Sequence, residues 1–557
     1  MMTKDSLSLS ALFIPILFTI AGSADGGSIV FDEVAERSGV KFRFQTGSRG
    51  MRDLPEIMGG GSALFDCDGD GDLDLYCCDG GPIVPKPGYV DKPCRLYKNQ
   101  GDWRFVDATD GSGAPGPSYA TGAATGDYDG DGRVDLLVTG WRDRRLYHNE
   151  GNGRFRDVTR FAGLESNRWS SSAAFADLDG DGDLDLFISN YIEYDALKAP
   201  YCSAPDGVRD YCGPEDFPAS SGQLYRNEGD GTFREVSIES GIAAAKNGRG
   251  LGVLIADLVG DRAPDIFVAN DGSACFLFEN QGKMRFREVA VASGVAFNAR
   301  GDAIAGMGVG RGDLDGDGGI DFLVGDLYER STVCFRLIGE GTYRDDSEFF
   351  GVAAATRRAT GFGLVLADFD SDGALDLIQA NGHVLARERL GIPFAMPTIL
   401  LRNDARGKMI DASKRAGPWF EKAILGRGVA VGDLDGDGDL DAVVAALDSN
   451  LAILRNDSTG GRGIVLNLIA ESRFGRDPVG TCVRAKIGER VIVRDIYGGG
   501  SYLSASDRRV HLGLGTAKRI DSIEIEWPSS RIETWIDPAI KGATIDFIEG
   551  TGVPISK

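Results

Sequence analysis

The segment Asp177–Ser189 reads DLDGDGDLDLFIS and joins an Asp/Gly-rich turn to a strand-like run. Alternating glycines let a chain curl tightly, because glycine adopts backbone conformations that other residues rarely adopt. The run that follows is rich in residues that favour extended structure. Related segments start at Asp66, Asp127, Asp257, Asp313, Asp368 and Asp433. Spacings of about 50 to 80 residues predict an array built from one repeated unit.

The second half of the unit recurs together with the first. Leu146–Asn149 (LYHN) is followed by GNGRFRDV, and Leu224–Asn227 (LYRN) is followed by GDGTFREV. Phe and Val alternate there with polar residues at a period of two, which is typical of half-buried strands. Each unit is therefore expected to be a small antiparallel sheet.

The two ends of the array complement each other. The last unit has its Asp433 loop and Leu454–Asn456, but its final strand is missing, and FDEV at Phe31–Val34 supplies one. Closing a ring removes exposed sheet edges. Six whole units and one split unit predict an all-β fold: a seven-bladed β-propeller closed by the N-terminal strand, followed by a small C-terminal β-rich domain.

The domain boundaries follow from these patterns. The apolar stretch Leu9–Ile20 is too short to span a bilayer, so residues 1–24 read as a signal peptide, with a short membrane anchor as the alternative. Residues 25–459 are assigned to the propeller, 460–550 to the C-terminal domain and 551–557 to a tail. No later segment is apolar enough for a membrane span. The chain is expected to be exported, whether secreted, periplasmic or at the cell surface.

The Asp/Gly loops are candidate metal sites. Aspartates at loop positions 1, 3, 5 and 9, with a backbone carbonyl at position 7, give an oxygen-only shell that suits Ca²⁺. The flanking segments are strands and position 12 lacks Glu, so the loops are not EF-hands. The alternative is a set of solvated Asp-Gly turns without metal. The candidate ligand positions are Asp66, Asp68, Asp70, Asp72 and Asp74; Asp127, Asp129, Asp131, Arg133 and Asp135; Asp177, Asp179, Asp181, Asp183 and Asp185; Asp313, Asp315, Asp317, Gly319 and Asp321; Asp368, Asp370, Asp372, Ala374 and Asp376; and Asp433, Asp435, Asp437, Asp439 and Asp441.

The fourth loop departs from this pattern. It reads DLVGDRAPD, in which Val259 replaces the position-3 carboxylate and Arg262 replaces a glycine. Asp257, Asp261 and Asp265 remain, so weak or no binding is expected there. The sequence thus predicts six strong calcium sites and a degenerate seventh. Affinities of extracellular calcium modules, ~10⁻⁴ to 10⁻³ M, are expected.

These motifs carry a family resemblance. DCDGDGDLD, DYDGDGRVD, DLDGDGDLD and DLDGDGGID, each trailed by LYxN and GxFxxV, resemble FG-GAP/VCBS repeats. That resemblance implies a propeller of the integrin α-chain kind, with calcium in the corresponding loops. VGTCVRAKIG from Val479, GGGSYLSASDRRVHLGLG from Gly498 and IEIEWPSSRIETW from Ile523 resemble the ASPIC/UnbV module of the cartilage acidic protein family. YCGP at Tyr211–Pro214 fits the same family, which implies an extracellular calcium-binding protein.

Net charge and cysteine usage limit the kinds of partner, disulfide and metal site that we expect. The formal net charge of −24 disfavours a nucleic-acid partner. Cys202 and Cys212 bracket a polar loop and are the first choice for a disulfide, followed by Cys78 with Cys94. Cys334 occupies a position that is Leu in other repeats and is expected to be buried. With no CxxC and three histidines, a zinc site is not expected.

The sequence favours a binding protein over an enzyme. No catalytic motif is found, and His383 on a loop is more simply explained by a structural hydrogen bond. The long insertions Gly80–Pro93, Tyr191–Ser221 and Gly382–Pro397 should emerge on one rim, which suits a binding, adhesion or matrix-interaction scaffold. The expected partner is an extracellular protein or glycan. The loop aromatics that would suit such contacts are Tyr89, Trp141, Tyr191, Tyr194, Tyr201, Tyr211 and Phe217.

Other interpretations stay open. A propeller-based hydrolase or lyase acting on polysaccharide or another extracellular substrate, and a purely structural matrix protein, are the alternatives. Gly498–Ser506 reads as a flexible turn or a ligand loop. Arg508, Arg509 and His511 read as a solvated surface or as contacts for an anionic ligand.

Overall fold

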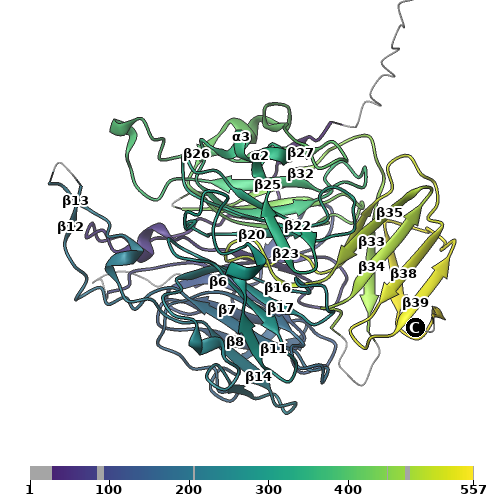
Figure 1. The fold of residues 1–557 in the computed structure, drawn as a ribbon, viewed down its shortest axis with the longest axis horizontal. Coiled ribbons are helices and arrows are strands. Elements are labelled where there is room, and N and C mark those ends of the chain that lie inside the picture. The colour runs from purple at the N-terminus through teal and green to yellow at the C-terminus, as the bar shows by residue number, and fades with distance from the viewer. Residues whose placement is uncertain (1–27, 85–92, 205–206, 448, 471–476, 556–557) are drawn as a thin grey trace, which may run out of the picture.

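The structure is a computed structural model that describes residues 28–84, 93–204, 207–447, 449–470 and 477–555. The expected signal segment and Tyr89 lie outside these residues. The described chain is almost entirely β-structure, with strands arranged as a ring of sheets beside a smaller β module (Figure 1). The predicted all-β propeller fold is therefore confirmed.

The ring consists of antiparallel sheets that share one order of strands. Four-stranded meanders recur seven times among the described residues. We label these sheets A to G along the chain. They are A, β2 (Ser62–Phe65), β3 (Asp74–Cys77), β4 (Arg95–Asn99), β5 (Phe105–Asp107); B, β6 (Ala120–Gly126), β7 (Asp135–Gly140), β8 (Arg145–Gly151), β9 (Arg154–Asp157); C, β10 (Ser170–Ala176), β11 (Asp185–Asn190), β14 (Gln223–Asn227), β15 (Phe233–Glu235); D, β16 (Gly250–Ala256), β17 (Asp265–Asn270), β18 (Phe276–Asn280), β19 (Phe286–Glu288); E, β20 (Val309–Gly312), β21 (Asp321–Val324), β22 (Val333–Gly339), β23 (Thr342–Asp345); F, β24 (Gly361–Ala367), β25 (Asp376–Asn381), β27 (Ile399–Asn403), β28 (Met409–Asp411); and G, β30 (Gly426–Gly432), β31 (Asp441–Ala446), β32 (Ala452–Asn456) and β1 (Phe31–Glu33).

Residue size explains the position of each strand. The innermost strands are rich in small residues, as in ATGAATG of β6, and are fully buried where seven of them converge. The second strands are apolar and buried on both faces, as in DLFISN of β11. The outer strands alternate: in β9 only Phe155 is buried, and its neighbours face solvent. Cys334 on β22 is 0% exposed, as expected.

The N-terminal strand lies at the outer edge of the last sheet. Phe31 pairs with Asn456 and Glu33 with Leu454 in an antiparallel register. The Phe31 side chain is buried against Phe369 and Phe420, with ring centroids 5.4 and 5.8 Å apart. Segments from the two ends of the array therefore close the ring in one sheet.

The C-terminal module contains two sheets. One is β37–β33–β40 (Val510–Gly513, Gly463–Ile469, Thr544–Ile548), in which β33 and β40 run parallel. The other is β35–β34–β38–β39–β41 (Arg490–Asp495, Cys482–Ile487, Ser522–Glu526, Ile532–Ile536, Val553–Pro554). Strand β41 lies in the segment assigned to a tail. Among the described residues, no helix has the length and apolarity that a bilayer crossing needs.

Short elements decorate the ring. Two-stranded pairs form between β12 (Cys202–Ser203) and β13 (Arg209–Asp210), and between β26 (Met396–Pro397) and β29 (Ala423–Ile424). The helices α1 (Ala290–Ser293), α2 (Ser347–Phe350) and α3 (Val352–Thr356) lie between sheets. Single 3₁₀ turns occur at Leu54–Ile57, Pro214–Asp216, Ile242–Ala244, Glu388–Leu390, Ser413–Arg415 and Pro418–Glu421.

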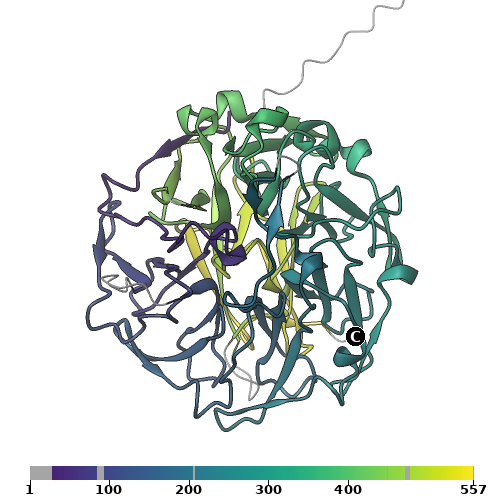
Figure 2. The same ribbon diagram turned by 90° about the vertical axis from the view of Figure 1, so that its left-hand side faces the viewer.

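A segment of the C-terminal module fills the centre of the ring. Figure 2, viewed along the ring axis, shows the yellow C-terminal chain behind and through the middle of the sheets. We call residues 497–507 the central plug. Its strand β36 (Gly498–Gly499) pairs with the inner strand β16, and Ala505 bridges Ala63 on β2. Inner strands of two sheets are therefore paired with residues of the module.

The plug contacts the inner strands of all seven sheets. The amides and hydroxyls of the plug bond to Val253 on β16, Val309 on β20, Val429 and Val431 on β30 and Ser62 on β2, and the carbonyl of Leu503 accepts from Ala123 N on β6. A Cβ added at Gly498 would lie 2.4 Å from the Phe175 carbonyl on β10. Tyr502, which is 0% exposed, stacks edge-on against Phe362 on β24 at 5.0 Å. The expectation of a flexible turn at Gly498–Ser506 was wrong, because the segment is held by these contacts and residues 501–504 are buried. A ligand role for this segment stays a prediction.

Candidate metal centres

Each Asp loop is a tight curl organised by its first aspartate. In sheet C, Asp177 Oδ1 accepts a hydrogen bond from Gly180 N at 2.8 Å, and Oδ2 accepts one from Gly182 N at 3.0 Å. Gly180 has a φ of +80°, which an L side chain rarely adopts. Position 5 repeats the motif, since Asp181 Oδ1 accepts from Asp183 N at 3.1 Å. Carboxylates thus point into the curl from consecutive turns.

The same curl recurs in the other loops. The position-1 carboxylates of Asp66, Asp313, Asp433 and Asp257 accept from the amides at positions 4 and 6, whereas those of Asp127 and Asp368 accept from positions 5 and 6. Position 7 donates its backbone amide to position 5 whatever its side chain, at Asp72, Arg133, Asp183, Gly319, Ala374 and Asp439. The variable side chain there is therefore compatible with a conserved backbone role.

The position-9 aspartate is buried beneath each curl. Asp185 is 1% exposed, and its two oxygens accept from Leu178 N and Asn227 N, both at 2.9 Å. Burial raises the pKa of this carboxyl group to about 8. Burial likewise raises the pKa of Asp74 to about 6 and that of Asp321 to about 7. Without a cation these loops hold carboxyl groups under conditions that disfavour their charge.

Oxygen atoms in the curl are left for a cation. Asp68 Oδ1 and Asp370 Oδ1, both at position 3, are buried without a hydrogen-bond partner. Carboxylate oxygens of Asp66, Asp68 and Asp70 lie within 4.8 Å of one another, and so do those of the sets Asp127/Asp129/Asp135 and Asp177/Asp179/Asp185. Buried carboxylates normally pair with a cation or a hydrogen-bond donor. The residues of these loops therefore fit a hard divalent ion such as calcium.

A basic side chain from the third strand competes for several of these oxygens. This side chain belongs to the third residue of the LYxN motif, directly before the asparagine. Lys98 Nζ lies 2.8 Å from Asp68, Arg336 Nη2 2.7 Å from Asp315, and Arg402 Nε 2.6 Å from Asp370. His148 Nδ1 lies 3.0 Å from Asp129. In sheets C and G the equivalent Arg226 and Arg455 pair instead with Glu228 and Asp457, which leaves the position-3 carboxylate free of this contact.

The degenerate fourth loop lacks the position-3 carboxylate and the third-strand base. Val259 removes the position-3 carboxylate, and the third-strand base is replaced by Glu279, which pairs with Arg287. Arg262 at position 6 reaches the module and lies 3.5 Å from Glu526. Asp257 nevertheless keeps the curl through Gly260 N and Arg262 N. The loop therefore retains its shape and loses the features that suit an ion.

The asparagine of LYxN joins neighbouring sheets, a role that the sequence pattern alone did not reveal. Asn227 Nδ2 donates to Leu184 O in its own loop and to Tyr128 O in the preceding loop. Asn99 does the same between the last and first sheets, through Leu434 O at 2.7 Å. Sheet E has Leu337 at this position, and Tyr343 Oη replaces the bond by donating to Leu258 O at 2.8 Å. The remaining members are Asn149, Asn280, Asn403 and Asn456.

The module docks on the same loops. His511 Nε2 donates to Gly438 O at 2.8 Å, and Arg494 donates to Gly373 O at 3.1 Å. Asp477 accepts from Asp127 N at 2.8 Å and pairs with Arg508, while Arg509 pairs with Asp507. Burial lowers the pKa of His511 to about 4. The expectation of a solvated surface at Arg508, Arg509 and His511 was wrong, because the two arginines pair with Asp477 and Asp507 of the module and His511 is buried against Gly438 O. A contact of these residues with an anionic ligand stays a prediction.

Other candidate residues have structural partners. His383 is buried and its Nδ1 accepts from Leu385 N at 3.0 Å, as expected for a structural histidine. Tyr191, Tyr194 and Phe217 are buried around Trp169 and do not face solvent. Tyr201 is 65% exposed.

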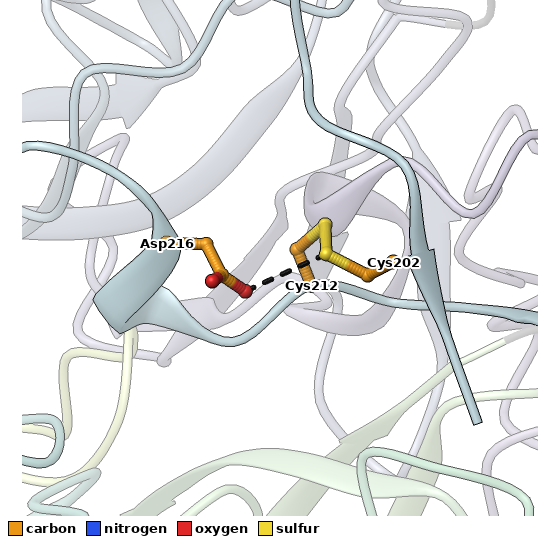
Figure 3. Close-up of side chains that lie close together, drawn as sticks. All are labelled: Cys202, Cys212 and Asp216. Atoms are coloured by element: carbon orange, nitrogen blue, oxygen red, sulfur yellow. Dashed lines mark hydrogen bonds between the residues drawn. A yellow bond between two sulfur atoms is a disulfide. The ribbon is translucent and has the colours of Figure 1, made fainter. Parts of the chain in front are cut away.

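The predicted disulfide between Cys202 and Cys212 is present (Figure 3). The carboxylate of Asp216 lies 3.5 Å from Cys202 Sγ. Because both sulfurs are in the disulfide, this cluster is not a thiolate metal site. Cys78 and Cys94 are thiols here, which differs from the second expected pairing.

The insertion that carries β12 and β13 lies on the face opposite the module. Figure 1 places β12 and β13 at one end of the molecule and the yellow module at the other. The Asp loops face the module, since its side chains bond to Gly373 O and Gly438 O. The face that carries the 191–221 insertion is therefore free of the module.

Comparisons with known proteins agree with this architecture. The FG-GAP-like repeat family matches residues 66–138, 127–188, 257–324 and 313–378, and the ASPIC and UnbV family matches residues 472–550. Cartilage acidic protein 1 of Mus musculus is 27% identical over 309 residues, and that of Homo sapiens is 26% identical over 309 residues. These matches cover 54% of this chain and 45% and 44% of the relatives, so the chain spans about half their length.

Among solved structures, an Agrocybe aegerita protein that recognises non-reducing terminal N-acetylglucosamine aligns with a TM-score of 0.39 at 18% identity. The alignment covers 70% of this chain and 86% of that one. An exotype rhamnogalacturonan lyase aligns with a TM-score of 0.32 at 14% identity, over 71% of each chain. Likenesses of this size carry no argument about function.

Proposed function

We propose that this chain, in which FG-GAP-like repeats are followed by an ASPIC and UnbV module, is an exported calcium-binding scaffold for adhesion or matrix interaction. Calcium would occupy the six regular Asp loops, and the partner would be an extracellular protein or glycan. The observation that carries the calcium proposal is the set of buried position-3 oxygens of Asp68 and Asp370, which no donor satisfies.

The role of the ion follows from its place in the fold. Each curl lies between the first two strands of a sheet, and its position-9 aspartate receives an amide from the third strand. A bound cation would neutralise carboxylates that burial otherwise forces to hold protons. Since the unfolded loop has no preformed site, the free energy of binding adds to the stability of the fold.

The free face is the proposed binding surface. The plug fills the centre of the ring and the module covers the Asp loops, so a partner would reach the opposite face. A groove of about 810 Å³ there is lined by Trp141, Arg168, Glu193 and Lys246. Leu197 and Tyr201 are 78% and 65% exposed on the adjoining insertion. Aromatic and aliphatic groups beside charges are typical of protein and glycan contacts.

Calcium stoichiometry tests the first half of the proposal. Equilibrium dialysis at pH 7.5 should give about six ions per chain at calcium concentrations above ~10⁻³ M. Asp179→Asn removes one carboxylate of the sheet C loop and should lower the stoichiometry by one. Asp302→Asn, on an exposed carboxylate outside the loops, is the matched control and should leave it unchanged. Absence of stoichiometric uptake by the parent protein would refute the calcium proposal.

Binding arrays test the second half. Extracellular protein and glycan arrays should give retained ligands in calcium, with the signal weakened by Tyr201→Ala and by Leu197→Ser. A matched substitution on the outer edge of the module, Ile536→Ser, should have no effect, because that exposed side chain lies far from the insertion face. Equal loss with all three substitutions would place the binding surface elsewhere.

A further inference from the structure

Cys78 and Cys94 stand opposite each other at the base of the first insertion. Cys77 pairs with Arg95 in the register of β3 and β4, so the next residues along the two strands, Cys78 and Cys94, face each other. Residues 79–93 lie between them in sequence. The two cysteines therefore flank the segment that connects β3 to β4, at the end of sheet A opposite its Asp loop.

The backbone pattern shows the type of pair. Cys78 N donates to Gly61 O and Cys94 N donates to Pro115 O, so both amides point away from the partner strand. Facing residues that do not exchange amide bonds have Cα atoms about 4.5 Å apart. Disulfides span Cα separations from about 4.4 to 6.8 Å. The main chain thus brings the two residues within disulfide range.

The side chains point into the same cluster. Cys78 and Cys94 are buried together beside Tyr76 and Ala114, whereas Cys77 packs into a different cluster on the other side of the sheet. Both side chains are 0–1% exposed. Asp79 N donates to Cys94 Sγ at 3.3 Å. The geometry thus selects Cys94 as the partner of Cys78 and excludes Cys77.

We propose that Cys78 and Cys94 form a second disulfide, which closes the 79–93 insertion at its base. In the presence of a disulfide oxidant such as oxidised glutathione, the two thiols and one oxidant molecule give the protein disulfide and two reduced glutathione thiols. Two sulfur–hydrogen bonds and one sulfur–sulfur bond break, one sulfur–sulfur bond forms in the protein, and the protons pass to the leaving thiols. The exchange runs through a mixed disulfide.

Burial determines when the bond forms. Both sulfurs are inaccessible in the folded ring, and burial raises the pKa of Cys78, so the reactive thiolate is scarce there. Oxidation therefore takes place while the chain folds. Like Cys202–Cys212, the bond would lie in the connection between the second and third strands of a sheet. It does not depend on calcium, so its failure would leave the proposed metal sites intact.

Thiol counting tests the pairing. The denatured protein is refolded in a buffer of oxidised and reduced glutathione, denatured again, alkylated without reduction and weighed. Of the nine cysteines, five should be alkylated if both disulfides form. Seven alkylated cysteines would mean that only Cys202–Cys212 has formed and would overturn the proposal, and so would nine.

Variants separate the pairing from its neighbours. Cys77→Ala keeps both disulfides and should give four alkylated cysteines, whereas Cys78→Ala should give six because Cys94 loses its partner. Peptide mapping of the unreduced parent should show Cys78 joined to Cys94, and a Cys77–Cys94 peptide would refute the assignment. Glutathione added after folding of the reduced protein should change the count at least tenfold more slowly than glutathione present during refolding. Equal rates would contradict the role of burial.

Discussion

Removal of calcium should make the stability of this protein depend on pH in a defined direction. The perturbation is a chelator, applied in parallel with saturating calcium, between pH 5 and pH 8. The groups that respond are the buried loop carboxyls, whose folded pKa values are raised above the unfolded value near 3.8 by loss of hydration, as for Asp185 and Asp321. An acid with a raised folded pKa favours the native state below its unfolded pKa. It loses that contribution as the pH rises toward its folded pKa.

The size of the effect follows from the shifts. One pKa unit corresponds to about 1.4 kcal/mol, so Asp185, with a pKa of about 8, costs the metal-free fold as much as about 4 kcal/mol between pH 5 and pH 8. For Asp321, with a pKa of about 7, the cost is about 3 kcal/mol and ends near pH 7. Bound calcium raises the free energy of unfolding by about 1.4 kcal/mol per loop when its free concentration is ten times the dissociation constant, which offsets part of this cost.

Thermal unfolding followed by circular dichroism measures both parts. The melting temperature of the chelated protein should fall as the pH rises from 5 to 8, and the increment that calcium restores should grow over the same interval. At pH 5 the increment should be smallest, because protons neutralise the same oxygens that calcium would bind. A chelated protein whose melting temperature rises with pH, or a calcium increment that is constant with pH, would refute the reasoning.

Three further perturbations test separate contacts. Tyr502→Ala removes the buried ring of the plug that stacks on Phe362, and guanidinium unfolding should show a loss of about 3 to 5 kcal/mol for the propeller, with an equal stability of variant and parent as the contradicting outcome. Tyr343→Phe leaves Leu258 O without its inter-sheet donor and should lower the free energy of unfolding by about 1 to 3 kcal/mol. Amide exchange should become faster in sheets D and E only, and faster exchange over the whole ring would contradict a local role of this hydrogen bond. Arg402→Met releases the carboxylate of Asp370 and should raise the calcium affinity of the sheet F loop by ~10-fold in titration calorimetry, since a nearby positive charge disfavours a cation; a weaker affinity would mean that Arg402 helps to shape the site.

The parts of the fold that repeat could be predicted from the sequence. Each Asp loop contains its own turn chemistry, so the Asp177 curl needs little beyond Gly180 and neighbouring amides. The period-two alternation around Phe155 identifies an outer strand because one face of it meets solvent. Ring closure was also inferable, because Phe31–Val34 matches a strand that the last unit lacks. Local periodicity therefore determines the sheets and the candidate ligands.

The contacts between distant segments could not be predicted in the same way. Gly498–Ser506 looks like a loop because small residues are common in turns, yet its small residues are needed where seven inner strands converge. At Gly61 an added Cβ would lie 1.7 Å from Leu503 O, so the propeller is shaped for the plug. The side chains after the plug look solvated in sequence, but Arg508 and Arg509 pair with Asp477 and Asp507, and His511 bonds to Gly438 O. No local pattern identifies these partners. Both errors concern the contact between module and ring.

The fourth loop shows how the metal sites and the module are related. In sheets A, B, E and F the position-3 aspartate has a basic neighbour, and in sheet D the aspartate and the base are lost together, at Val259 and Glu279. Val259 offers no carboxylate to a third-strand base, and Glu279 at that strand position pairs with Arg287 instead. Arg262, at position 6 of this loop, lies 3.5 Å from Glu526 of the module. A loop that no longer suits an ion therefore still contributes to the contact that holds ring and module together.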